Sequence, residues 1–184
     1  MRRITDKFSV FELLAISLMA ALGIAVKPVV SSLAKIITGP LAIPSGVIAG
    51  GIYMMFLILA CGLTNKRPTG ALTAAVQALI VMLTGIGSQG IMSFVTYILP
   101  GAAVDLVMLP FSLRDKARPK APACFCAGIA ANVTGSFLVS SVLFDIPLIP
   151  LLLSLAAAAL SGGLGGLLAY FILKQIYKTG LLNN

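Results

Sequence analysis

The sequence contains no histidine and no tryptophan, and only five of its 184 residues are acidic. Histidine is the commonest metal ligand and general base in proteins, so its absence argues against metal-dependent and acid–base enzymes. Charged residues make up 10% of the chain, against about 25% in soluble domains, and apolar residues make up 59%. A soluble fold of this size cannot hide so much apolar surface from water, so the composition indicates a membrane protein.

Catalytic and nucleotide-binding motifs are missing as well. The glycine-rich stretch at 162–166 lies inside an apolar run and lacks the Lys-Ser/Thr ending of a phosphate-binding loop. The cysteines are Cys61, Cys124 and Cys126, an odd number in apolar surroundings, which indicates free thiols. No other cysteine or histidine completes a metal site beside Cys124 and Cys126. We therefore expect no enzyme activity, no catalytic residue, no metal and no cofactor.

Six apolar runs are long enough to cross a bilayer, which takes about 20 residues of helix. The sequence thus predicts an all-α membrane protein, a single integral membrane domain over residues 1–184. The expected helices lie near residues 8–30, 43–63, 68–85, 90–113, 121–144 and 147–175. The third run is short, and the last is long enough to tilt or to project from the membrane.

The basic residues give the orientation. The net charge of +8 comes from clusters between the apolar runs, which indicates membrane topology and not nucleic-acid binding. With the N-terminus inside, six spans place every lysine and arginine except Lys27 and Lys35 on the cytoplasmic side. The positive-inside rule therefore predicts that both termini are cytoplasmic.

Small residues spaced by four allow close helix contact in lipid. Ser17, Ala21 and Ala25 form such a stripe on the first helix, where docking of a partner and internal packing are both open. Similar stripes on the second helix (Gly46, Gly50) and the last (Ala158, Gly162, Gly166) favour ordinary internal packing.

The segment after Lys27-Pro28 is longer than a turn requires. Proline ends or kinks a helix, so we expect Val29 to Thr38, with Lys35, to lie outside the first helix. The segment then serves either as a lid over the outer mouth of the bundle or as a plain interfacial loop.

Polar side chains in the middle or outer half of the runs are candidate ligand contacts, because such groups are costly in lipid unless paired. The candidates are Lys35, Tyr53, Gln89, Tyr97, Asn132 and Asp145. Asn132, like Gln77, has the alternative of bridging neighbouring helices. Asp145 has the alternative of capping the last helix.

Two acidic residues lie inside the runs. Asp105 follows Pro100-Gly101 and lies nearer the cytoplasmic side, where a structural role is favoured over proton transport because no second carboxylate or histidine continues a relay. Glu12 lies near the inner end of the first helix and is expected to snorkel or to pair with a basic residue such as Lys7.

Taken together, these features resemble the substrate-binding S components of energy-coupling factor (ECF) transporters. The resemblance is carried by the small basic six-helix chain, the Ser17, Ala21 and Ala25 stripe, the stretches 39–51 and 66–71, and Pro100 to Asp105. Some features look closest to the thiamine and hydroxymethylpyrimidine branch. That branch tends to use tryptophan, histidine and acidic residues around its ligand, whereas this chain has no tryptophan or histidine, and Gln77 stands where an acid is expected.

The resemblance implies a high-affinity binding subunit of a vitamin importer in a bacterial-type cytoplasmic membrane. It implies a ligand site on the outer side, with the Ser17, Ala21 and Ala25 stripe docking on a membrane coupling subunit that works with two ABC ATPases. A cationic thiazolium would favour stacking aromatics and a carboxylate, and this chain offers only tyrosines and phenylalanines with Asp145. A neutral or anionic ligand therefore stays open. Two other classes also stay open: a small secondary transporter or channel, and a membrane assembly factor without transport activity.

Overall fold

The structure, a computed structural model, describes residues 8–41, 45–66, 68–85, 92–114, 120–143 and 147–179. Within these residues it has six α-helices and no strand, which confirms the predicted all-α class. The helices are α1 (Val10–Thr38), α2 (Gly46–Thr64), α3 (Thr69–Thr84), α4 (Met92–Arg114), α5 (Ala121–Leu138) and α6 (Leu148–Lys178). Two short segments extend them, the 3₁₀ turn η1 (Gly39–Leu41) after α1 and the π-helical η2 (Val139–Leu143) after α5.

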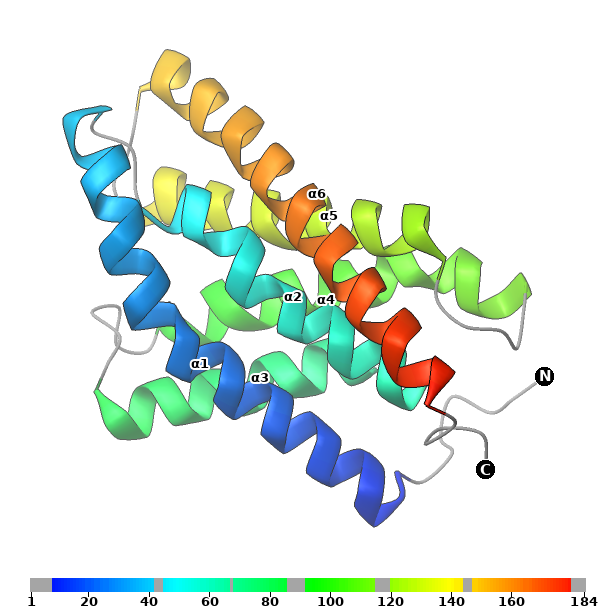
Figure 1. The fold of residues 1–184 in the computed structure, drawn as a ribbon. Helices are drawn as coiled ribbons and strands as arrows, with labels where there is room; N and C mark the ends of the chain where they lie inside the picture. Colours follow the sequence, from blue (N-terminus) through cyan, green and yellow to red (C-terminus); the bar gives the residue numbers. More distant parts are fainter. Residues whose placement is uncertain are drawn as a thin grey trace.

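The helices form one bundle in which α2 is central (Figure 1). Helix α2 packs against α1, α5 and α6, while α3 pairs with α4 and α4 with α5. In an 18-residue apolar stretch of α2, 67% of the residues are buried, against 28% in the corresponding stretch of α1. The start of α1 and the end of α6 lie at the same end of the bundle (Figure 1). We call this the terminal end and the other the opposite end.

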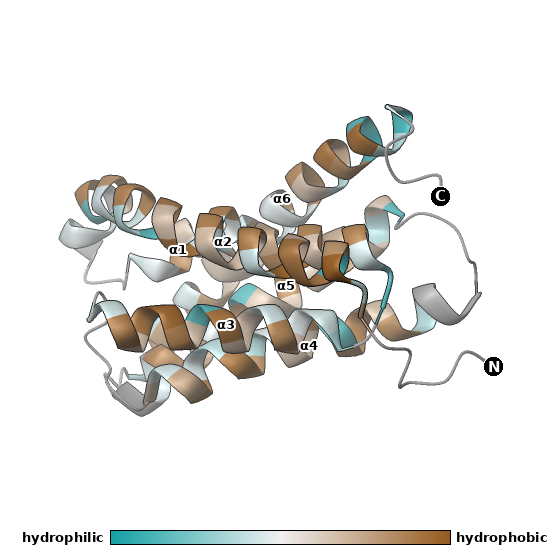
Figure 2. Ribbon diagram, turned by 90° about the horizontal axis from the view of Figure 1, so that it is seen from below, coloured by the Kyte–Doolittle hydropathy of each residue, from teal (hydrophilic) through white to brown (hydrophobic). Residues whose placement is uncertain are grey.

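Five of the six helices are long and apolar enough to cross a membrane. Apolar residues run along them, and hydrophilic residues gather at the end of α6 (Figure 2). Helix α3 has 16 residues, a length of about 24 Å that falls short of the roughly 30 Å hydrocarbon core. That the terminal end faces the cytoplasm stays a prediction from the charge distribution.

Helix α1 differs from the expectation. It continues through Pro28 to Thr38, so the prediction that Val29–Thr38 lies outside the helix as a lid or loop is wrong. Proline removes only one backbone donor from the ladder, and the Ser32 hydroxyl donates to the Pro28 carbonyl at 2.8 Å. Ala34 and Thr38 are buried against the bundle, and this packing stabilises the added turns.

Glycines let the backbones of α2, α5 and α6 touch. A methyl group on Gly50 would overlap the Asn132 amide, and one on Gly162 or Gly166 would overlap backbone oxygens of α5. Dispersion contacts and close approach drive helix association in lipid, where apolar burial alone gives no advantage. The small-residue stripes of α2 and α6 therefore serve internal packing, as predicted.

Candidate functional site

A lysine and two tyrosines from three helices meet inside the half of the bundle nearer the opposite end. The Lys27 ammonium of α1 donates a hydrogen bond to the Tyr97 hydroxyl of α4. It also lies over two aromatic rings, 4.6 Å from the centroid of Tyr97 and 5.4 Å from that of Tyr53 on α2. We call these three residues the Lys27 cluster.

The packing of the bundle holds the two tyrosines in place. Tyr97 is 8% exposed and packs in an apolar cluster with Ile24 of α1 and Val81 of α3. The Tyr53 hydroxyl donates to the carbonyl of Gly46, two helical turns earlier on α2, at 3.4 Å. Both rings are therefore fixed by neighbours that do not depend on the lysine.

A positive charge inside the bundle needs compensation. Aromatic faces attract an ammonium by about 0.5–2 kcal/mol, more when water is excluded. Glu12 and Asp105, the acidic residues in the described part of the chain, are engaged elsewhere, with Lys66 and with the backbone of α3. Because an ammonium carries three donors and Tyr97 accepts one, Lys27 can still donate to an acceptor on a ligand.

The sequence predicted two of these three residues. Tyr53 and Tyr97 were candidate ligand contacts, and the structure brings them together. Lys27 is not among the predicted contacts, because Lys-Pro indicates the end or a kink of a helix. The signal that points to it is a cation within an apolar run, which is costly unless it is paired or functional.

The other predicted contacts do not join the cluster. Lys35 is exposed on α1, eight residues beyond Lys27, which is about 12 Å along the helix axis. Gln89 and Asp145 lie outside the described residues.

Asn132 is fully buried between helices. Its amide donates to the carbonyl of Val47 on α2 at 3.0 Å and to that of Ala158 on α6 at 2.8 Å. These bonds join three helices, which is the bridging alternative considered for this residue. Gln77, also buried, lies close to α1, because a methyl group on Gly23 would overlap its amide.

Asp105 binds the first turn of α3. Its carboxylate accepts the backbone N–H of Gly70 at 2.9 Å and that of Ala71 at 2.8 Å. The first N–H groups of a helix have no partner within it and carry a positive partial charge, so a carboxylate here is favourable. Asp105, which belongs to α4, thus caps the N-terminus of α3. This cap is a structural role of the kind predicted.

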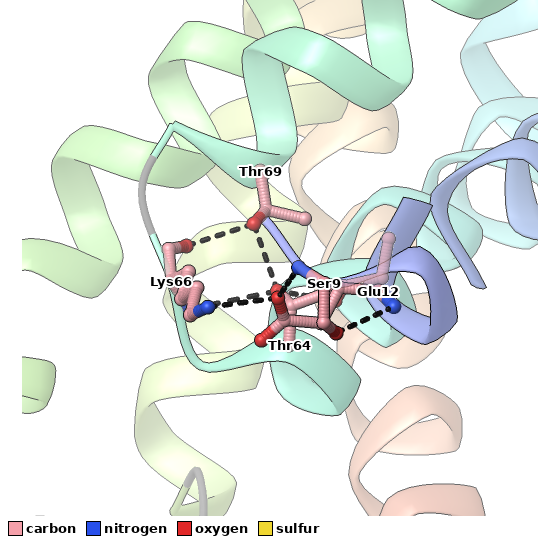
Figure 3. Close-up of polar contacts among 6 residues, drawn as sticks. Ser9, Glu12, Thr64, Lys66 and Thr69 are labelled. Atoms are coloured by element: carbon pink, nitrogen blue, oxygen red, sulfur yellow. Dashed lines mark hydrogen bonds and ion pairs between the residues drawn. The ribbon is translucent and has the colours of Figure 1, made fainter. Parts of the chain in front are cut away.

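Glu12 forms an ion pair with Lys66, which follows α2, while Lys7 lies outside the described residues. The Lys66 ammonium lies 2.8 Å from the Glu12 carboxylate, which also accepts the Ser9 N–H as part of a capping box (Figure 3). Beside them the hydroxyls of Thr64 and Thr69 are 2.8 Å apart (Figure 3). These contacts fix the α2–α3 connection against the start of α1.

The small-residue stripe of α1 faces outward. Ser17, Ala21 and Ala25 are all exposed, whereas Ile16 and Ala20 on the other face are buried in the bundle. In the part of the chain that the structure describes, these three small residues therefore do not serve packing inside the bundle.

Comparison with known proteins gave two matches. Residues 11–134 match the family described as "ABC-type cobalt transport system, permease component". A solved structure described as "Crystal structure of an S-component of ECF transporter" aligns with a TM-score of 0.77 and 22% sequence identity, covering 96% of this chain and 89% of that one. No curated protein matches the sequence significantly.

Proposed function

Because this chain belongs to the family described as ABC-type cobalt transport system, permease component, and has the fold of an ECF S component, we propose that it is the substrate-binding subunit of an ECF importer. The observation that carries the proposal is the Lys27 cluster. It is a polar site built from three helices inside a mostly apolar bundle, it contains a cation, and it lies in the half predicted to face outward.

The chemistry of the cluster favours an organic ligand. An ammonium and two phenols suit a ring that carries hydrogen-bond acceptors, such as a pyrimidine, or one that carries a carboxylate or phosphate. Cobalt ions prefer imidazole, thiolate or carboxylate ligands, and a dication would be repelled by Lys27. The same repulsion disfavours the thiazolium of thiamine next to Lys27, but not its neutral pyrimidine precursor. The substrate we propose is therefore a vitamin-like micronutrient.

Transport then requires partners, because the chain has no nucleotide-binding motif. We propose that a membrane coupling subunit docks on the exposed stripe of Ser17, Ala21 and Ala25 and links the chain to two ABC ATPases. Helix α1 suits this role, since its outward face also exposes the large apolar residues Leu14 and Leu18.

The test is ligand binding by the purified chain in detergent, without partners or ATP. Extraction and mass spectrometry first identify any bound compound, and calorimetry then measures its affinity beside hydroxymethylpyrimidine, thiamine and cobalt chloride. Replacing Lys27 by Met removes a hydrogen bond from a charged donor, worth about 1.5–3 kcal/mol, so affinity should fall roughly 10- to 150-fold.

Two further variants locate the site. Tyr97→Phe keeps the ring but removes the hydroxyl that accepts from Lys27, so a smaller loss is expected. Lys35→Met makes the same change as Lys27→Met on the exposed part of α1. If Lys35→Met weakens binding and Lys27→Met does not, the site lies at the end of α1 and the proposed cluster is wrong. If no compound binds, the binding-subunit proposal itself fails.

A further inference from the structure

A basic pocket lies at the terminal end of the bundle, far from the Lys27 cluster along the helices. It has a volume of about 480 Å³ and is formed where the start of α5 meets the last turns of α6. Small-molecule sites in proteins span about 300–1,000 Å³, so the pocket is large enough for a polar headgroup. Its lining includes Lys120, Lys174, Lys178, Tyr170, Tyr177 and Leu173.

The three lysines surround the pocket from two helices. Lys174 and Lys178 are four residues apart and so share one face of α6, while Lys120 immediately precedes the first turn of α5. All three residues are exposed at the surface of the bundle. The N-terminus of α5 adds a positive partial charge on the same side.

The length of α6 puts the pocket at the expected depth of lipid headgroups. The helix has 31 residues, a length of about 46 Å, whereas the hydrocarbon core is roughly 30 Å thick. The excess falls at the last turns, because the start of α6 exposes Leu148 and Ile149 whereas its end exposes Lys174 and Lys178. Tyrosines are typical of this interfacial level, and Tyr170 and Tyr177 both line the pocket.

An apolar track leads from the pocket toward the membrane centre. Phe171, Leu168 and Leu164 on α6 are 57%, 50% and 62% exposed, and Phe171 lies one turn before Lys174. A molecule that filled the pocket with an anionic group and lay along this track with an apolar chain would match both surfaces.

We propose that this pocket binds the phosphate headgroup of an anionic phospholipid. Basic pockets between transmembrane helices recognise such headgroups. Lysines at the end of α6 are also favoured by the helix dipole and by membrane topology. Neither effect, however, accounts for a concave site that combines lysines from two helices with an adjoining apolar track. The proposal does not depend on the transport function.

Native mass spectrometry of the purified full chain, delipidated and then given equal amounts of phosphatidylglycerol and phosphatidylcholine, tests this site. We expect one phosphatidylglycerol to be retained preferentially. Each lysine near an anionic surface is worth about fivefold in affinity, so Lys174→Gln with Lys178→Gln should reduce retention roughly 30-fold. The charge-preserving pair K174R and K178R should keep it.

Three outcomes would overturn the proposal: equal retention of the two lipids, full retention by the glutamine variant, or loss in the arginine variant. Adding glycerol 3-phosphate separates lipid from free phosphate, because displacement of the lipid by this headgroup alone would assign the site to soluble phosphates. Micronutrient binding, measured on the same samples, should not change.

Discussion

The cap that Asp105 provides for α3 gives the most direct test of the interpretation of the fold. Both carboxylate oxygens are used, one by the Gly70 N–H at 2.9 Å and the other by the Ala71 N–H at 2.8 Å. In Asp105→Asn the amide oxygen can accept only one of these donors, and the NH2 group faces the other. The loss of one charge-assisted bond and of the interaction with the helix terminus amounts to about 2–3 kcal/mol.

This loss should lower the midpoint of thermal unfolding in detergent by roughly 5–10 °C for a chain of this size. Hydrogen exchange should also become faster at the amides of Gly70 and Ala71. The matched control is Glu12→Gln, the same carboxylate-to-amide change in a partly exposed ion pair, which should cost only about 0–1 kcal/mol. If Asp105→Asn leaves stability and exchange unchanged but abolishes pH-driven uptake in vesicles without any ATPase, the cap is not the role of Asp105. The chain would then be a proton-coupled secondary transporter.

Three further predictions concern the helix contacts. Asn132→Ala removes two interhelical hydrogen bonds and should destabilise the bundle by about 1–3 kcal/mol in thermal unfolding. A loss of ligand binding at unchanged stability would instead show that Asn132 contacts the substrate. Gly165→Ala places a methyl group against the backbone of Gly51 and should cost about 1–3 kcal/mol, whereas Leu164→Ala at an exposed position next to it should have little effect. Ala21→Trp should prevent co-purification with the coupling subunit while ligand affinity stays the same; if both fall together, the stripe does not serve docking.

Much of the fold could be predicted from the sequence because a continuous apolar run of about 20 residues fits a helix that satisfies its own backbone, whereas barrel strands are about 10 residues long and alternate. The apolar run that begins at Ala121 indicates a helix. The Lys-Arg-Pro stretch at 66–68 indicates the connection between the second and third helices. The end of the first helix could not be predicted this way. Pro28 is a local signal for a break, but burial of Ala34 and Thr38 against the bundle outweighs it.

The candidate site could be predicted only in part. Tyr53 and Tyr97 stood out because polar groups are rare in such runs, yet nothing in their spacing links them to each other or to Lys27. The contact between them depends on how α1, α2 and α4 cross. Likewise the ion pair of Glu12 with Lys66 joins residues far apart in the chain.

The sequence by itself determined the membrane class, the number of helices and the grouping of positive charge, since these follow from local composition and the length needed to cross a bilayer. The tertiary structure decided which polar groups meet. It places Asp105 on the start of α3 and Asn132 between three helices, and it places Lys27 against two tyrosines. The reason is physical: a polar group in lipid must find a partner, and only the packing of the helices determines which partner lies within reach.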